Sequence, residues 1–489
     1  MSEQILFSPP DIAVGRARPL QDGLGFPARF RSIGRRTFVG AALLLGDLIA
    51  AWLAAELVQA LVHLAAQDPT PLPHLHPGLI VLVFLAQGLY SGSGLSPCER
   101  FRLRGIGVLL FVALDFLVVS GSGGLMRVAA EAACAAALLV GVGFYMELLV
   151  KRALVWLGPW MAPAALVGCS DATQRLYRTL AAQPELGLRP VGFIATDTHA
   201  DAQPSALPLP LLGTIEDFAR ASRDVEVAIL TTSEQLSIAG DLADPPSARL
   251  VLLSDVQDAQ MLWLRPRTLG NAVGLEFRRD PYLAQSRLLK RAIDLAIAVP
   301  AAVLTAPLIG VLALLIKMTD RGPAFYVQSR VGQCGRPINV PKLRTMYKDA
   351  SRRLEEHLRT NPQASDEWQR YFKLSNDPRI LPRVGNFIRR ASLDELPQLW
   401  SVITGDMSLV GPRPFPAYHV DRFDAEFQHI RTTVPPGLTG LWQVSARSDG
   451  DLDVQQAQDT FYIRNWSIWL DLYILLQTIP AVMSAKGAK

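Results

Sequence analysis

Residues Ser392 to Pro416 read SLDELPQLWSVITGDMSLVGPRPFP. Asp394 and Glu395 stand side by side at the start of an apolar, helix-like segment. A turn at Gly405-Asp406 follows, and the stretch ends in the Gly-Pro-Arg-Pro clamp from Gly411 to Pro414. Two carboxylates, a rigid turn and an arginine suit phosphate chemistry, because phosphoryl transfer needs a nucleophile, charge neutralisation and usually a divalent metal. We therefore expect the rest of the chain to bring substrates to this point.

The two carboxylates also fit a purely structural role. Ser392 and Glu395 match the S-x-x-E capping box, whose side chains only satisfy backbone groups at a helix start. Pro397 instead favours a helix that begins at about Leu396, with both carboxylates just ahead of it. In either register the carboxylates lie at the positive end of the helix dipole, which keeps them ionised. The surrounding cationic residues favour a phosphate site over a simple cap, and they are Lys342, Arg344, Arg389 and Arg413.

The composition indicates a protein of several domains with membrane segments. The chain has 489 residues, of which 50% are hydrophobic and 19% charged, so we expect two or three domains and apolar spans. The net charge is +4, and basic residues cluster beside apolar runs, which favours anionic lipid or phosphate partners over nucleic acid. The 4 cysteines lack the spacing of a zinc or iron–sulfur site, which indicates a reduced compartment. The first residues lack the pattern of a cleaved secretion signal.

Four apolar segments predict a transmembrane bundle over residues 36–152, after a polar cytoplasmic tail at residues 1–35. The first segment is long enough for a hydrocarbon core that needs about 20 residues, whereas the second is marginal. Basic residues flank the start of the first segment, the connection between the second and third, and the exit of the fourth, so the positive-inside rule places both ends of the bundle in the cytoplasm. The alternative is a large soluble helical core. The segments are Thr37–Ala66, Gly78–Tyr90, Gly105–Val119 and Ala129–Val150.

Residues 160–256 read as a small Rossmann-like α/β module. Strand-like runs such as AALVG and VEVAILTT alternate with helical runs such as DATQRLYRTLAA, and this alternation predicts a parallel sheet of the doubly wound type. The turn after the first strand, Gly168 to Asp171, retains one glycine of a GxGxxG motif. We therefore favour a structural or regulatory role for the module, with a bound dinucleotide as the alternative.

A linker at residues 257–286 leads to a different kind of membrane segment, from Leu295 to Lys317. This segment is nearly uncharged, contains Pro300 and Pro307, and has basic residues at both ends. Equal basic flanks and a helix-breaking proline fit a re-entrant helix that enters the cytoplasmic face, bends and returns. The alternative, a straight fifth span, would place everything after it outside the cell.

The chain after this segment supplies the remaining parts of the expected site. AFYVQSRVGQCGRPINVPKLRTM predicts two strands around a glycine-containing turn, and a strand would place Lys342 and Arg344 on one face. Ala350 to Phe372 reads as a charged amphipathic helix that is interrupted near Asn361-Pro362. The aromatic and aliphatic segment from Thr460 to Val482 fits either an interfacial membrane helix or a helix packed on the catalytic core.

Together these motifs resemble the bacterial sugar transferase family, the polyprenyl-phosphate hexose-1-phosphate transferases. The resemblance covers residues 287–489 and rests on KRAIDLAIAVP, GPAFYVQSRVG, KLRTM, NDPRI, SLDELPQLWSVITGDMSLVGPRP and PPGLTGLWQVSARS. It implies a monotopic α/β catalytic domain on the cytoplasmic face of the bacterial inner membrane. It also implies transfer of a sugar 1-phosphate from a UDP-sugar to undecaprenyl phosphate, with release of UMP, at the start of O-antigen, exopolysaccharide or capsule synthesis.

The resemblance further implies a role for each residue of the site. Asp394 would be the nucleophile that carries a covalent phosphosugar, and Glu395 would bind Mg²⁺. Pro307 would bend the re-entrant helix, although the Ser-Pro pair usual in the family is Ala306-Pro307 here. Contacts to the phosphates and the substrate would come from Lys342, Arg344, Arg389, Arg413 and Pro414.

Several features stay open at the level of the sequence. Galactose is favoured over glucose because the overall plan is most similar to undecaprenyl-phosphate galactose phosphotransferases. A glycosyltransferase that releases UDP and a membrane-anchored, non-catalytic regulator of polysaccharide assembly are the competing functions. Membrane lipids are expected partners, nucleic acid is not, and the oligomeric state is open between a monomer and a homodimer.

Overall fold

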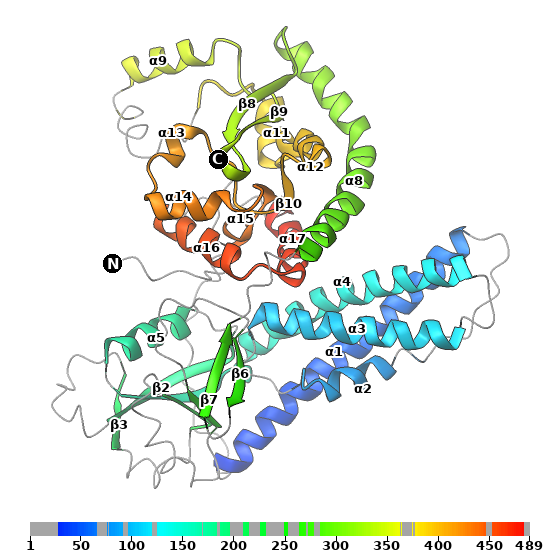
Figure 1. Ribbon diagram of the computed structural model, residues 1–489, viewed down its shortest axis with the longest axis vertical. Helices are drawn as coiled ribbons and strands as arrows, with labels where there is room; N and C mark the ends of the chain where they lie inside the picture. Colours follow the sequence, from blue (N-terminus) through cyan, green and yellow to red (C-terminus); the bar gives the residue numbers. More distant parts are fainter. Residues whose placement is uncertain are drawn as a thin grey trace. The chain divides into compact units, whose positions relative to one another are not determined.

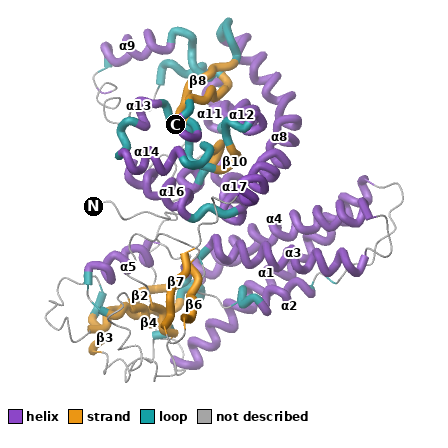
Figure 2. The backbone as a smooth tube through the Cα atoms, viewed as in Figure 1, coloured by secondary structure: helices purple, strands orange, loops and turns teal. Residues whose placement is uncertain are grey.

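The computed structural model divides the chain into two compact units, residues 11–259 and residues 260–489, which are drawn in Figures 1 and 2. The structure describes residues 28–65, 76, 78–90, 96–119, 125–168, 170–182, 186–195, 209–214, 225–230, 249–252, 264–269, 272–277, 284–361, 363, 374, 377–445 and 452–483.

Four helices with a common apolar core open the first unit. Buried side chains from all four pack together, among them Ala54, Phe84, Val108 and Leu139. Large apolar side chains such as Trp52 remain exposed on the outer surface, where lipid would cover them. The helices are α1 (Ala28–Ala65), α2 (Leu79–Ala86), α3 (Pro97–Val119) and α4 (Leu125–Leu157). Helix α1 thus begins before the predicted end of the polar tail.

Three helices of the described chain are long and apolar enough to cross a membrane, so the protein is a membrane protein. They cover Gly34–Leu64, Met126–Leu157 and Ser286–Thr319. Helix α2 has only 8 residues, well short of the about 20 that a hydrocarbon core requires. Helix α3 carries several charged residues near its start. The four-span topology therefore stays a prediction, which the length and apolar composition of α1 and α4 support.

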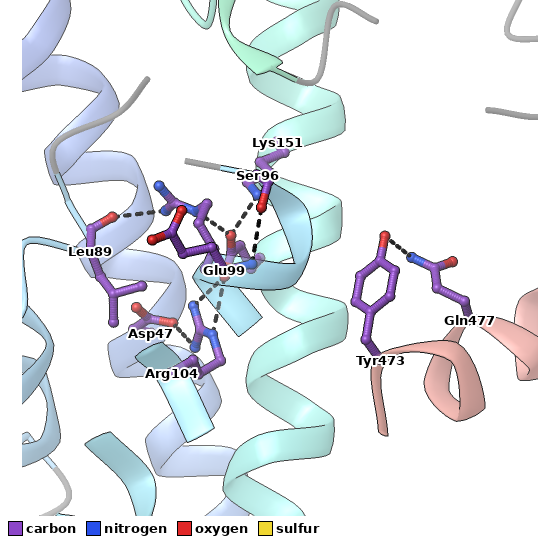
Figure 3. A network of polar contacts seen from close by, with 10 residues as sticks. Asp47, Leu89, Ser96, Glu99, Arg104, Lys151, Tyr473 and Gln477 are labelled. Atoms are coloured by element: carbon purple, nitrogen blue, oxygen red, sulfur yellow. Dashed lines mark hydrogen bonds and ion pairs between the residues drawn. The ribbon is translucent and has the colours of Figure 1, made fainter. Parts of the chain in front are cut away.

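A buried charge network connects α1, α3 and α4, and Figure 3 shows Arg104 facing Asp47 within it. Arg104 donates to Asp47 at 2.6 Å and to Glu147 at 2.7 Å. Arg100 also donates to Glu147, at 2.8 Å, and Lys151 pairs with the same carboxylate at 2.6 Å. Buried charges are tolerated only when they are paired, so this network fixes how the three helices pack.

The described strands of the first unit form a five-stranded parallel sheet in the order β3-β2-β1-β4-β5. This order is that of a doubly wound fold, which confirms the predicted parallel sheet. Alternate residues of β1 enter different apolar clusters, with Val167 in one and Leu166 in the other. The elements are β1 (Ala162–Val167), α5 (Asp171–Ala182), β2 (Leu188–Ala195), β3 (Leu211–Thr214), β4 (Val227–Leu230) and β5 (Arg249–Leu252). The run TIEDFARAS at residues 214–222, which reads as a further helix of this module, lies almost entirely outside the described residues.

The second unit begins with a hairpin that the sequence did not predict. Residues 257–286 read as a linker, yet β6 (Leu264–Leu269) and β7 (Ala272–Phe277) pair there as antiparallel strands.

Helix α8 (Ala284–Thr319) follows as one continuous helix that contains both Pro300 and Pro307. Figure 1 shows it curving along the other elements of the second unit. A proline cannot donate to the carbonyl four residues before it, which weakens the helix at that point. Close to Pro307, the hydroxyl of Thr305 donates to the Ala301 carbonyl at 2.7 Å. The re-entrant path of α8 through a membrane stays a prediction.

The remainder of the second unit is built on the end of α8 and a β-hairpin. Strands β8 (Phe325–Val331) and β9 (Pro337–Leu343) pair as antiparallel strands, which confirms the two strands predicted around a turn. Leu312 and Ile316 of α8 pack with Leu343 of β9 in one buried cluster. The elements that follow are η7 (Gln333–Gly335), α9 (Ala350–Thr360), α11 (Val384–Arg390), η8 (Leu393–Gln398), α12 (Leu399–Thr404), β10 (Ser408–Val410), α13 (Ala417–Val420), α14 (Ala425–Thr432), β11 (Gly437–Thr439) and α15 (Leu441–Ser445).

Two helices end the described chain, α16 (Leu452–Arg464) and α17 (Ile468–Met483). Tyr462 and Trp466 are buried in the second unit, with exposed fractions of 2% and 5%. These two aromatic side chains therefore serve the packing of the core, as the second interpretation of this segment expected.

Candidate functional site

The carboxylate pair lies on a short 3₁₀ helix and not on a capped α-helix. Element η8 contains Asp394 and Glu395 in its first turn, and α12 begins only at Leu399. Ser392 precedes η8 in the left-handed region, with φ at 54°, and its side chain makes no capping hydrogen bond. The capping-box interpretation is therefore wrong, and Glu395 is left free to contact other parts of the chain.

Glu395 is held by two cations that come from distant parts of the sequence. Its Oε1 atom accepts from Lys342 Nζ at 2.8 Å and from Arg413 at 2.7 Å. Burial alone would raise the pKa of Glu395, but the charges of Arg413 and Lys342 outweigh it and hold the pKa at about 2. Glu395 in turn raises the pKa of Arg413. Glu395 and Arg413 are thus both ionised at neutral pH.

Asp394 behaves differently although it is the adjacent residue. Burial raises the pKa of Asp394, the charge of Lys342 opposes this, and the negative charge of Glu395 adds to the rise. No hydrogen bond or ion pair joins its side chain to another described residue. The sequence predicted that the helix dipole would keep both carboxylates firmly ionised, and for Asp394 burial works against that. A buried carboxylate without a strong partner is a more reactive base and nucleophile than a paired one.

An arginine and an aspartate near the start of α8 hold the backbone that directly follows the carboxylate pair. Arg291 donates to the carbonyls of Val402 at 2.6 Å and Ile403 at 2.7 Å, which lie at the end of α12. Asp294 accepts from the Ser408 hydroxyl at 2.8 Å in β10. In the sequence this part of the chain reads as a basic membrane flank and as the motif KRAIDLAIAVP, and nothing local indicates which distant carbonyls it contacts.

The Gly-Pro-Arg-Pro clamp is fixed by a close approach of two glycines. Gly411 donates to the Thr439 carbonyl at 2.9 Å, and Gly437 donates to the Pro412 carbonyl at 2.9 Å. A Cβ atom on Gly411 would lie only 2.5 Å from the Pro435 carbonyl oxygen, so no larger residue fits. Arg431 donates to the carbonyl of Arg413 itself. This geometry delivers the Arg413 side chain to Glu395.

A small pocket that is partly open to solvent lies beside these groups. Its lining includes Lys342, Glu395, Arg413, Pro414, Gln398 and Arg330. Arg330 was not predicted as a site residue. The alternation of side chains along β8 could have indicated it, because Arg330 occupies the same face of the hairpin as Lys342.

The remaining predicted residues fall into two groups. Arg389, near the end of α11, lowers the pKa of Asp394 by its charge, and its buried Nη1 has no hydrogen-bond partner among the described residues. Arg344 instead donates to the carboxylate of Asp320 at 2.7 Å and to the Asp320 carbonyl at 2.6 Å. The structure thus brings Lys342, Arg413 and Pro414 to Glu395, and it gives Arg344 a different partner from Lys342. Phosphate contacts by these residues stay predictions.

Comparisons with known proteins show which family the chain resembles. The model of the family described as "Bacterial sugar transferase" matches residues 285–485. An uncharacterized sugar transferase of Haemophilus influenzae is 32% identical over 367 residues, which span 72% of this chain and 76% of that protein. The undecaprenyl-phosphate galactose phosphotransferase of Salmonella typhimurium is 32% identical, over 70% of this chain and 73% of its own length. The UDP-glucose:undecaprenyl-phosphate glucose-1-phosphate transferase of Escherichia coli is 30% identical, over 64% of this chain and 66% of its own.

Proposed function

The chain belongs to the bacterial sugar transferase family, and we propose that it transfers a hexose 1-phosphate from a UDP-sugar to undecaprenyl phosphate with release of UMP. Such an enzyme is a phosphoglycosyl transferase that starts the synthesis of a lipid-linked O-antigen, exopolysaccharide or capsule. Galactose 1-phosphate is the favoured group, because the galactose phosphotransferase is 32% identical over 70% of this chain. Glucose 1-phosphate is the alternative, because a glucose-1-phosphate transferase is 30% identical over 64% of this chain.

The observation that carries the proposal is the contrast between the two adjacent carboxylates. Glu395 is ionised and paired with two cations, whereas Asp394 is buried without such a pair. The two residues therefore suit different tasks in one reaction. Asp394 suits covalent attack, and Glu395 suits electrostatic organisation of the phosphates.

The reaction then has two displacements at one phosphorus atom. A carboxylate oxygen of Asp394 attacks the phosphorus that bears the sugar, and the bond to the bridging oxygen breaks so that UMP leaves. An oxygen of undecaprenyl phosphate next attacks the same phosphorus and breaks the bond to Asp394. Lys342, Arg389 and Arg413 stabilise negative charge on the phosphate oxygens in both steps.

The residues at the site fit a bound Mg²⁺ that the donor helps to hold. Among the described residues no cluster of three or more His, Cys, Asp or Glu could bind a metal alone. Mg²⁺ commonly uses one or two carboxylates together with substrate phosphates and waters, and ionised Glu395 offers such a carboxylate. When bound, the ion would neutralise charge on the diphosphate. Donor phosphates would compete for Lys342 and Arg413 and so free Glu395 as a ligand.

The proposed location is the cytoplasmic face of the bacterial inner membrane, with α8 re-entrant. A native residue can report it, because Cys334 lies exposed in η7 of the catalytic unit. A membrane-impermeant thiol reagent should label Cys334 in inverted vesicles but not in intact spheroplasts, and the Cys334→Ser variant supplies the background. Labelling in intact spheroplasts alone would mean that α8 crosses the membrane as a straight span.

The decisive experiment is the release of nucleotide by the Asp394→Asn variant in the presence of a UDP-sugar and undecaprenyl phosphate. The variant should release no UMP, and it should carry no label from a donor with a radioactive sugar, which the native chain should retain in the absence of acceptor. Near-normal UMP release by a folded Asp394→Asn variant would exclude the covalent route. A panel of UDP-sugars identifies the hexose, and release of UDP in place of UMP would favour an ordinary glycosyltransferase. A chain that releases neither nucleotide would fit the non-catalytic regulator.

A further inference from the structure

Arg330 projects from the same side of the catalytic hairpin as Lys342. In the β8–β9 pair Tyr326 lies opposite Lys342, and Arg330 lies opposite Ile338. Residues directly opposite each other share a face of the sheet, and every second residue of a strand returns to that face. Tyr326 and Arg330 are four residues apart. Arg330 therefore faces the site on which Lys342 acts.

Two hydrogen bonds hold the guanidinium of Arg330 in place, but its buried Nε donor has no partner among the described residues. One terminal nitrogen donates to the Pro414 carbonyl at 3.0 Å, and the other donates to the side-chain oxygen of Gln328 at 2.6 Å. The Nε atom is buried and has no hydrogen-bond partner among the described residues. A buried donor without a partner is unfavourable, so an acceptor that reaches Arg330 would gain a preoriented cation.

The cavity that Arg330 lines also has an excess of positive charge. Arg330, Lys342 and Arg413 all line it, and Glu395 is the one carboxylate in the lining. Glu395 already accepts from both Lys342 and Arg413. Cations collected in this way around a single carboxylate favour an anionic ligand, and a phosphate group carries the matching charge and acceptor oxygens.

We propose that Arg330 binds the phosphate of the uridine nucleotide that leaves as UMP. Glu395 lines the cavity and the nucleophile Asp394 does not, so an anion in the cavity lies beside Glu395 and not beside the attacking residue. The phosphate under attack has to reach Asp394, which leaves the second phosphate of the donor for the cavity. This inference rests on the proposed function, and it makes Arg330 a substrate-binding residue for the donor.

The test compares the binding of UMP with that of uridine, which lacks the phosphate. Equilibrium dissociation constants are measured on the full chain in detergent for the native protein and for Arg330→Gln. A charge-assisted hydrogen bond that contributes about 1.5–3 kcal/mol corresponds to a change of roughly 10-fold or more in affinity. We therefore expect Arg330→Gln to weaken UMP binding by roughly 10-fold or more and to leave uridine binding unchanged. Arg336→Gln is the matched control, because Arg336 is exposed on the same hairpin.

Two outcomes would overturn the inference. An equal loss of UMP and uridine affinity would mean that Arg330 only supports the loop through the Pro414 carbonyl, and unchanged UMP affinity would mean that it does not meet the phosphate. If Arg330→Gln does not fold, Arg330→Lys replaces it, since lysine keeps the charge and should retain part of the preference for UMP. A native chain that binds no UMP would overturn the proposed function itself, and this result differs from native binding that Arg330 does not influence.

Discussion

The charge of Glu395 should contribute measurably to the stability of the catalytic unit, and the variant Glu395→Gln tests this. The carboxylate is 19% exposed and accepts from Lys342 and Arg413 at 2.8 and 2.7 Å. The fall of its pKa from 4.5 to about 2, at about 1.4 kcal/mol per unit, corresponds to about 3 kcal/mol. At about 2–4 °C per kcal/mol for a domain of this size, Glu395→Gln should lower Tm by about 6–12 °C at pH 7.

The sign of the pH dependence follows from the direction of the shift. Because the folded-state pKa of Glu395 is lowered, its contribution is complete above its ordinary value of 4.5 and is lost as the pH falls toward about 2. The difference in Tm between the native chain and Glu395→Gln should therefore shrink across this window. Differential scanning fluorimetry of the detergent-solubilised full chain measures both quantities.

The neighbouring carboxylate supplies the matched control. Burial raises the pKa of Asp394, so its ionised form costs stability at pH 7, and Asp394→Asn should leave Tm unchanged or higher. A Glu395→Gln variant as stable as the native chain, or a difference in Tm that is the same at pH 7 and pH 3, would refute the reasoning from the ion pairs.

Three further predictions concern other parts of the chain. The acid limb of the kcat/KM profile should lie above pH 3.8, the ordinary pKa of an aspartate, because burial raises the pKa of Asp394. The limb should move to higher pH in Arg389→Gln, because the Arg389 charge lowers the pKa of Asp394. A shift to lower pH would contradict the assignment of this limb to Asp394. Arg431→Gln should lower the free energy of unfolding by about 1–3 kcal/mol and reduce kcat/KM, since it removes the donor to the Arg413 carbonyl. The control is Arg390→Gln, at an exposed position, which should change neither Tm nor kcat/KM. Arg104→Gln should lower the free energy of unfolding by about 3–5 kcal/mol, because it removes a buried cation that pairs with Asp47 and Glu147. Arg127 is more exposed, and Arg127→Gln should lower the free energy of unfolding by less than about 1 kcal/mol in the same thermal assay.

The sequence by itself determined the features that depend on local pattern. Two strand-like runs around a glycine-containing turn predict the β8–β9 hairpin, and strand-like runs that alternate with helical runs predict the parallel sheet. The length of the apolar runs predicts membrane helices. The adjacency of Asp394 and Glu395 needs no structure either. These properties depend on a residue and its near neighbours in the sequence, so they can be predicted from the sequence alone.

The tertiary structure decided what depends on residues far apart in the chain. Lys342 reaches Glu395 across 53 positions of sequence, while Arg344 pairs with Asp320. The same folding gives Asp394 and Glu395 opposite pKa shifts, although a pattern in the sequence would treat them alike. Arg330 likewise lines the pocket beside Glu395 only because the folded chain brings the two residues together. Burial and Coulomb interactions are set by distances in space, and those distances exist only after the chain has folded.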